Sequence, residues 1–318
     1  MKRAFVTGAG GFVGANVVRR LLRDGNEVHV LLREPNAWRL EEISKDLHIH
    51  LGDLRNAEQL TRTIEAVRPE WIFHLAAYGA YSWQTELSTM IETNITGTMN
   101  LLNACLTIGF AAFVNAGSSS EYGFKDHAPL ETEFLEPNSN YAVTKASATL
   151  FCRSVAQARH ARVRTLRLYS GFGPYEEPRR LIPSLIVQGL KGALPKLASP
   201  HVARDYVYID DVVEAFLAAA TQTTEETGNV YNLGTAKQTS LREVVDVARQ
   251  VMKIAANPVW SSMPNRQWDT DRWVAENTRI QKELQWQPRV SFEEGLRKTI
   301  DWFCEHPKLL KFYEQQLA

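Results

Sequence analysis

The stretch that decides the fold lies near the start of the chain and reads Ala4-Phe5-Val6-Thr7-Gly8-Ala9-Gly10-Gly11-Phe12-Val13-Gly14. Its apolar run predicts a strand, and its glycines predict a tight turn that leads into a helix. Glycine lets the backbone approach a pyrophosphate closely, and the first turn of a helix offers free N–H groups and a positive dipole end. This order predicts a dinucleotide site. We expect the cofactor to contact Gly8, Gly11, Phe12, Val13 and Gly14.

Outward from this turn, short apolar runs alternate with amphipathic segments. We expect strands at 3–6, 27–32, 48–51, 71–75 and 111–115. We expect helices at 13–23, 58–67, 90–108 and 141–160. Apolar strands spaced by helices predict a parallel sheet covered on both faces. The fold class is therefore α/β, a Rossmann-type doubly wound sheet that binds ligands at the carboxyl ends of its strands.

The second half of the chain is less regular. We expect strands at 204–209 and 231–233 and helices at 211–220, 241–252 and 292–303. The interpretation is an NAD(P)-binding domain over 1–170, to which 203–234 returns, and a smaller discontinuous C-terminal lobe. That lobe, mainly 171–318, is expected to bind the substrate.

Composition excludes several classes of protein. The 36 basic and 36 acidic residues balance to a net charge of zero, which argues against a nucleic-acid partner. Cys105, Cys152 and Cys304 are far apart, and the eight histidines show no metal spacing, so we expect neither a disulfide framework nor a metal site. The chain has no signal-peptide pattern and no apolar run long enough for a membrane span. A reducing cytoplasm is the expected setting.

The pattern Thr7-Gly8-x-x-Gly11-x-x-Gly14 resembles the extended short-chain dehydrogenase/reductase superfamily and its NAD-dependent epimerase/dehydratase family. Gly52-Asp53-Leu54 looks like the adenine-binding segment of that family, and His74-Leu75-Ala76-Ala77 looks like its cofactor-lining turn. Asn94 matches its helix asparagine. The resemblance covers nearly the whole chain and implies further cofactor contacts from Asp53, Leu54, Leu75, Ala76, Ala77 and Asn94.

Tyr141 and Lys145 stand four apart, so a helix places both side chains on one face. Tyrosine has an ordinary pKa of about 10, and a nearby ammonium is expected to lower it toward a range useful for acid–base catalysis. The resemblance implies that Tyr141 and Lys145 are catalytic and that both contact the cofactor. A dinucleotide sensor without catalysis is an alternative, but the intact pair argues against it.

The resemblance gives the catalytic serine position to Ser118, in Gly117-Ser118-Ser119-Ser120-Glu121-Tyr122-Gly123. Its hydroxyl would hold the reacting oxygen. Ser119 is a second candidate for the same role, and all three serines are expected to contact the substrate. Sugar-nucleotide dehydratases of this family carry acidic residues where Ser119 and Ser120 stand, and Glu121 comes one position late. Dehydration is therefore disfavoured.

The residues at the end of the second predicted strand indicate whether the cofactor is NAD or NADP. NAD enzymes of this fold place an acid there, whereas NADP enzymes use a nearby arginine. Leu32 takes the acidic position and Arg33 follows it, with Arg39 as a possible helper. This favours NADP(H) and a reductase. Glu34 leaves NAD(H) open, and with it an epimerase that keeps its NAD bound.

The local sequence motifs of this chain are similar to those of reductases that act on 4-keto-6-deoxyhexoses carried by nucleoside diphosphates. Among these reductases are CDP-abequose synthase and the dTDP-4-keto-6-deoxyhexose reductases. The resemblance implies a nucleoside diphosphate sugar as substrate, held at the diphosphate by Arg204 and Arg266. Ser170 replaces the usual asparagine of that site. Aromatic residues are candidates for the sugar pocket, with Tyr81 preferred: Tyr81, Trp83, Phe172 and Tyr175. The helices at 90–108 and 141–160 are expected to form a homodimer contact.

Overall fold

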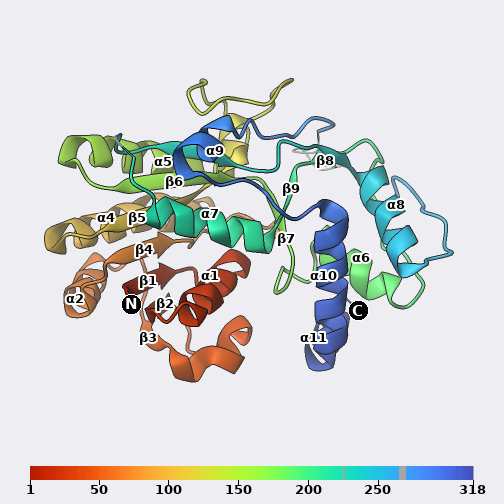
Figure 1. The fold of residues 1–318 in the computed structure, drawn as a ribbon, viewed down its shortest axis with the longest axis horizontal. Helices are drawn as coiled ribbons and strands as arrows, with labels where there is room; N and C mark the ends of the chain where they lie inside the picture. Colours follow the sequence, from red (N-terminus) through yellow and green to blue (C-terminus); the bar gives the residue numbers. More distant parts are fainter. Residues whose placement is uncertain (225, 265–269, 318) are drawn as a thin grey trace.

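The computed structural model describes residues 1–224, 226–264 and 270–317 and has a seven-stranded parallel sheet at its centre (Figure 1). The strand order is β10-β6-β5-β4-β1-β2-β3, and all six neighbouring pairs are parallel. The strands are β1 (Arg3–Thr7), β2 (Glu27–Leu32), β3 (His48–Leu51), β4 (Trp71–His74), β5 (Ala112–Ser118), β6 (Val163–Leu168) and β10 (Val230–Leu233). The order reverses beside β1, so the predicted doubly wound fold is confirmed.

Helices cover both faces of this sheet. One face carries α1 (Phe12–Arg23) and α7 (Ile209–Thr221), which pack on each other. The other carries α2 (Ala57–Val67), α4 (Gly97–Ile108) and α5 (Asn140–Arg159). Successive residues of β1 point to opposite faces, with Ala4 and Val6 in one buried cluster and Phe5 in the other.

The helix predicted over 90–108 is more complex than expected. A short α3 (Leu87–Met90) leads into a π-helical segment, η2 (Ile91–Thr96), before α4 begins. The π-helical segment contains Asn94, whose side chain bonds to neighbouring backbone in the site below. Such bulges within helices are frequent at functional sites.

The strand predicted over 204–209 is wrong in one respect, because it is broken at Asp205. β8 (Ala203–Arg204) pairs with β11 (Thr239–Ser240), and β9 (Tyr206–Tyr208) pairs with β7 (Ser170–Phe172). The buried carboxylate of Asp205 accepts backbone N–H groups from Thr235, Ala236 and Ala275. Only β10 of the returning segment joins the main sheet.

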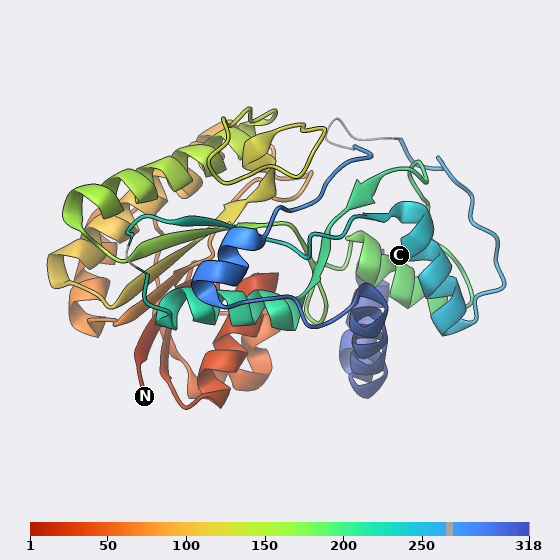
Figure 2. The same cartoon turned by 45° about the horizontal axis from the view of Figure 1, so that its top comes forward.

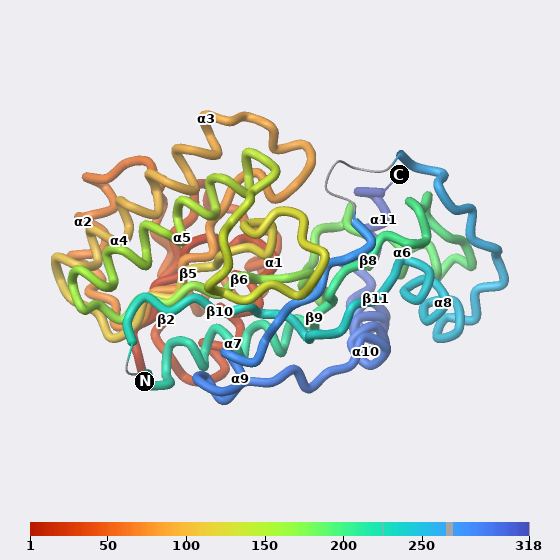
Figure 3. Tube along the Cα trace, turned by 90° about the horizontal axis from the view of Figure 1, so that it is seen from above, coloured from red at the N-terminus to blue at the C-terminus, as the bar shows by residue number. Residues whose placement is uncertain are grey.

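The remaining helices gather at one end of the molecule, beside the carboxyl ends of the strands (Figures 2 and 3). They are α6 (Leu181–Gly189), α8 (Leu241–Met252), α10 (Phe292–Glu305) and α11 (Pro307–Leu317), whereas α9 (Thr278–Leu284) lies against α7 and β10. The short 3-10 segment η1 (Trp38–Asp46) bridges toward α11 through the ring of Trp38, which lies 4.9 Å from that of Phe312. In the part of the chain that the structure describes, no helix is both long and apolar enough to cross a membrane.

Candidate active site

The glycine turn is packed tightly against the end of β4. Gly8 has a φ of +70°, and a Cβ added there would lie 2.5 Å from the backbone nitrogen of Ala76. A Cβ on Gly14 would lie 2.1 Å from the carbonyl oxygen of Gly8. Gly11 begins α1 and has no side chain to cap the first N–H groups of the helix. This cradle fits the pyrophosphate of a dinucleotide, because only glycine fits there and the helix donors point outward.

His74 ties the same turn to the helices behind it. Its Nδ1 lies 2.7 Å from Thr7 Oγ1 and its Nε2 lies 2.8 Å from Thr98 Oγ1. Thr98 already donates its proton to the carbonyl of Asn94, so the Nε2 of His74 carries the ring proton. Burial and then the charge of Lys145 lower the pKa of His74 to about 3. His74 is therefore a neutral structural residue.

Asn94 holds the segment that follows β4. Its amide accepts the N–H of Tyr78 at 2.8 Å and donates to the Tyr78 carbonyl at 2.7 Å. It also donates to Thr144 Oγ1 at 2.9 Å, one residue before Lys145. The side chain has no exposed surface, and its bonds position this turn and α5. The cofactor contact of Asn94 stays a prediction.

The segment predicted to bind the adenine end of the cofactor lies at the ends of β2 and β3. Both carboxylate oxygens of Asp53 bond to Arg55, at 3.0 and 2.8 Å. Arg55 and, more weakly, Arg33 hold the pKa of Asp53 below its usual range. Leu54 is buried beneath α4. The exposed Arg33 thus stands beside Asp53, directly after the buried Leu32.

Arg39 does not belong to this group. Its guanidinium is buried and donates to the carbonyls of Tyr175, at 2.7 Å, and Gly10, at 3.3 Å. It also pairs with Glu177 at 3.2 Å. Each of its three nitrogen atoms is therefore already bonded within the protein, away from Arg33 and Asp53.

Tyr141 and Lys145 lie in the first two turns of α5, which Ser139 caps through the N–H of Ala142. The hydroxyl of Tyr141 shares a hydrogen bond with Ser118. Burial outweighs this bond and raises the pKa of Tyr141 to about 12. The expectation of a lowered pKa is therefore wrong for the protein without ligands, and Tyr141 carries its proton at neutral pH.

Lys145 is buried and lies about one turn after Tyr141 on α5. Burial lowers its pKa, and the negative charge of Glu121 opposes that shift. The charge of Lys145 also acts on His74. These relationships place the ammonium between His74, at the end of β4, and Glu121, just after β5. The sequence predicted its place on one helix face with Tyr141 but not these partners.

The three serines after β5 face different partners. Ser118 contacts Tyr141, and its Oγ lies 2.6 Å from Ser120 Oγ. Ser119 is buried and accepts the indole N–H of Trp273 at 3.1 Å. The geometry therefore favours Ser118 as the partner of Tyr141. Ser119 instead bonds to Trp273, in the second lobe. Trp273 had no signal in the sequence.

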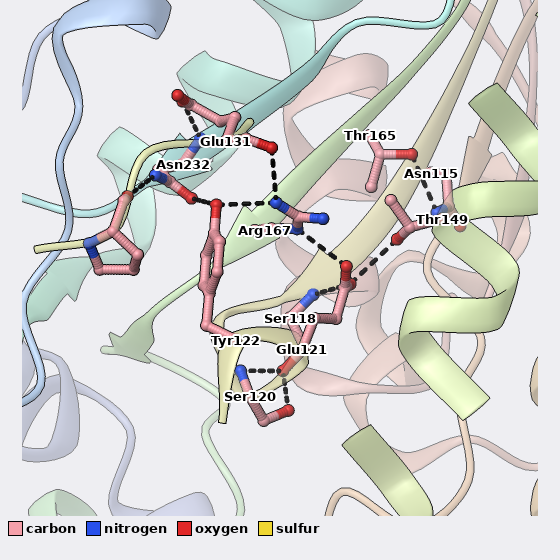
Figure 4. A network of polar contacts seen from close by, with 11 residues as sticks. Asn115, Ser118, Ser120, Glu121, Tyr122, Glu131, Thr149, Thr165, Arg167 and Asn232 are labelled. Atoms are coloured by element: carbon pink, nitrogen blue, oxygen red, sulfur yellow. Dashed lines mark hydrogen bonds and ion pairs between the residues drawn. The ribbon is translucent and has the colours of Figure 1, made fainter. Parts of the chain in front are cut away.

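A buried polar network lies behind these serines (Figure 4). Glu121 accepts the N–H of Ser118 at 2.8 Å and the hydroxyl of Thr149 at 2.9 Å through one oxygen, and Arg167 Nε at 2.8 Å through the other. Arg167 continues to the hydroxyl of Tyr122. The spacing Ser118-x-x-Glu121 is that of a capping box, which the helical turn after β5 forms, and this signal was missed.

The second lobe brings Arg204 toward the serines. Its guanidinium lies 5.5 Å from the ring centre of Trp273, which in turn lies 6.4 Å from the ring of Tyr169. A small hollow beside them is lined by Ser119, Tyr122, Tyr169, Arg272 and Trp273. Ser170 is half-buried in β7, and Arg266 lies outside the described residues.

The aromatic candidates separate into two groups. Tyr81 is half-buried, stacks on Trp83 at 4.8 Å, and is close enough to Tyr141 for their charges to interact. Phe172 and Tyr175 are buried in the aromatic core between the lobes. Phe172 and Tyr175 are therefore packing residues, and their suggested place in a sugar pocket is wrong.

Comparisons with known proteins agree with this geometry. The model of the NAD dependent epimerase/dehydratase family matches residues 4–234. The chain is 28% identical, over 96% of its length, to a trifunctional UDP-glucose 4,6-dehydratase/UDP-4-keto-6-deoxy-D-glucose 3,5-epimerase/UDP-4-keto-L-rhamnose-reductase of Arabidopsis thaliana, and spans 48% of that protein. It is 30% identical to the dTDP-glucose 4,6-dehydratase of Streptomyces griseus, over 95% of this chain and 94% of that protein.

The fold is also similar to that of solved structures of nucleotide-sugar enzymes. The crystal structure of UDP-glucose 4-epimerase from Thermus thermophilus, in complex with NAD, superposes with a TM-score of 0.85 at 30% identity. The match covers 96% of this chain and 99% of that one. The names of these relatives include dehydration, epimerisation and reduction, so the choice among reactions depends on the site.

Proposed function

This chain belongs to the NAD dependent epimerase/dehydratase family of extended short-chain dehydrogenases/reductases, and we propose that it is an NADPH-dependent reductase of a 4-keto-6-deoxyhexose carried on a nucleoside diphosphate. The observation that carries the proposal is the end of β2. The acidic position there is the buried Leu32, and the exposed Arg33 follows beside Asp53. An arginine at this place suits the 2′-phosphate of NADP.

Tyr141 is suited to give a proton in this reaction. The glycine turn from Gly8 to Gly14 would hold NADPH, which would supply hydride for the ketone carbon. The Tyr141 hydroxyl keeps its proton at neutral pH and donates it to the ketone oxygen as that oxygen gains charge. Ser118 holds the same oxygen, and the ammonium of Lys145 stabilises the phenolate that Tyr141 leaves behind.

The buried network argues against dehydration at this site. Elimination of water needs an acid and a base close to the sugar. Ser119 and Ser120 stand where dehydratases carry acids, and both oxygens of Glu121 are used within the protein. Glu121 therefore orders the end of β5 and takes no part in proton transfer.

The nucleoside diphosphate is proposed to lie across the smaller lobe, with Arg204 on its diphosphate and Tyr81 and Ser170 beside the sugar. The helices around 171–318 would form this substrate-binding lobe, as the sequence predicts. We also place the protein in the cytoplasm, consistent with Cys105 and Cys152 as free buried thiols.

A homodimer is the proposed assembly. The faces of α3, η2 and α5 that point away from the sheet expose four apolar side chains: Leu87, Ile91, Val143 and Leu150. An exposed apolar surface on two adjacent helical segments suits a helix–helix interface between two copies.

The second candidate is a nucleotide-sugar epimerase with tightly bound NAD, and the relative from Thermus thermophilus, solved with NAD, favours it. Titration of the purified protein with NADPH and NADH, followed by nicotinamide fluorescence, separates the two. Tighter binding of NADPH by ten-fold or more is the expected result. Preference for NADH, or NAD released on denaturing the protein as isolated, would replace the reductase by the epimerase.

A further inference from the structure

Three histidines meet on one face of β2 and β3, at the edge of the sheet. The parallel register sets His29 opposite His48, and His50 follows two residues later on the same face. The ring of His29 stacks on that of His48 at 4.5 Å and lies 5.2 Å from that of His50. The sequence showed no metal spacing because these residues come from two strands, and only the register brings them together.

A carboxylate completes the cluster. Glu27, at the start of β2, has Oε1 2.9 Å from His29 Nε2. One ligand atom from each of Glu27, His29 and His48 can be chosen so that all three lie within 4.8 Å of one another. Ligands of a tetrahedral zinc ion are roughly 3.4 Å apart, given bonds of about 2.0–2.1 Å. Binding would draw the ligand atoms together by at most about 1.4 Å.

The surrounding groups orient these ligands. Arg3 Nε bonds to the other oxygen of Glu27 at 3.1 Å, which leaves Oε1 toward His29. His29 Nδ1 lies 2.9 Å from His50 Nε2. If His29 binds a metal through Nε2, its Nδ1–H donates to His50. Such a partner for the second ring nitrogen is the usual support of a metal-bound histidine.

The residues of the cluster are buried to different degrees, and this arrangement suits the binding of an ion. His29 is buried, Glu27 is half-buried and His48 is exposed, so an ion has an entry path and one rigid ligand.

We propose that Glu27, His29 and His48 bind one divalent transition-metal ion of the zinc type, with His50 as the group that orients His29. The two imidazole ligands favour zinc, copper or nickel over magnesium, which prefers oxygen ligands. The site is separate from Tyr141, because β1 and β4 lie between β2 and β5 in the sheet (Figure 1). Its effect is to fasten the edge strand β3, whose other face exposes Ile49 and Leu51.

The test uses the full chain without a polyhistidine tag, stripped with EDTA and titrated with ZnCl₂ by calorimetry. One zinc ion per chain is expected. At free zinc 100-fold above the Kd, the Tm should rise by about 5 °C. Cobalt should give the visible absorption of a tetrahedral site. No binding below 1 mM zinc would overturn the proposal.

Three variants locate the ion. His48→Ala removes an exposed ligand without disturbing the core and should weaken zinc binding at least 10-fold, and His50→Ala should weaken it by about 10–100-fold. His127→Ala is the matched control, because His127 is exposed and also lies beside two carboxylates, Asp126 and Glu133. Unchanged binding in His48→Ala, or its loss in His127→Ala, would contradict the assignment.

Discussion

The carboxylate of Glu121 and the guanidinium of Arg167 form an ion pair with 2.8 Å between Oε2 and Nε, and their side chains are 0% and 3% exposed. The pair joins the end of β5 to β6 immediately behind Ser118. A buried pair is tolerated when its remaining donors and acceptors are satisfied, and here Thr149 and Tyr122 take part. Ser118 therefore lies on a rigid polar support.

Glu121→Gln is expected to destabilise the protein by about 3–5 kcal/mol, because Arg167 would keep a buried charge without its counterion. Urea unfolding followed by circular dichroism measures the loss. Glu58→Gln breaks the exposed pair with Arg62 and serves as control, with an expected change below about 0.5 kcal/mol. Equal stability of the two variants would show that the buried pair is not needed.

Tyr141→Phe should lower turnover by roughly 10²–10⁴-fold, since it removes the proton donor and leaves the fold intact. The assay is oxidation of NADPH with a 4-keto sugar nucleotide. NADPH binding and the Tm of the variant provide the controls, and both should stay close to wild type. Near-normal turnover would contradict the assignment of Tyr141 as the proton donor.

Glu176 predicts an unusual pH dependence of stability. Its carboxyl is buried, and among the described residues its Oε2 has no hydrogen-bond partner. Burial raises its pKa to about 8, against the weaker opposing charge of Arg180. Between pH 4.5 and 8 the folded state binds more protons than the unfolded state. This contribution is therefore complete below pH 4.5 and is lost as the pH rises through 8.

Glu176→Gln removes that titration. Relative to wild type, the variant should gain a few kcal/mol of stability between pH 5 and pH 9. The measurement is urea unfolding at pH 5, 7 and 9. Glu58→Gln, in an exposed position, should show no such trend. A difference between Glu176→Gln and wild type that is constant with pH would disprove the raised pKa.

Arg33→Ser should weaken NADPH binding by about 10–100-fold and leave NADH binding nearly unchanged, because only NADPH has the 2′-phosphate. Fluorescence titration of both cofactors gives the ratio. Arg62→Ser is the control, since Arg62 is an exposed arginine of α2. An equal loss for both cofactors would remove Arg33 from the 2′-phosphate.

A charge on the exposed apolar face of α5 should separate a homodimer. Val143 and Leu150 are 46% and 55% exposed, and Val143→Asp with Leu150→Asp should shift the mass from twice 36.0 kDa to 36.0 kDa. Light scattering after size exclusion measures this mass. Val259→Asp, at a residue that is 70% exposed outside this face, should leave it unchanged. A monomeric wild-type protein would refute the assembly.

The strands and the glycine turn could be predicted because their signals are local. The strands β1, β2, β4 and β5 are rich in apolar residues, and Gly8 stands in a glycine-rich turn directly after β1, where it has a positive φ. The break at Asp205 could not be predicted, since its acceptors bind N–H groups from residues 30 or more positions later. Register and long-range hydrogen bonds are decided by the folded chain.

Some contacts of the site could likewise be predicted from the sequence, and others could not. Tyr141 and Ser118 follow from sequence motifs, and the structure brings them together. The indole of Trp273 on Ser119 and the histidines of β2 and β3 depend on segments that meet only after folding. The pKa of Tyr141 was misjudged for a related reason: spacing on a helix gives proximity to Lys145 but does not give burial.

Arg39 ties the glycine turn to a distant part of the chain. It joins the Gly10 carbonyl to Tyr175 and Glu177, which lie in the chain leading to the second lobe. A displacement of either segment would therefore strain contacts made by the other. If the two segments hold different ligands, any coupling between those ligands through Arg39 would be reciprocal, and each would change the affinity for the other by the same factor.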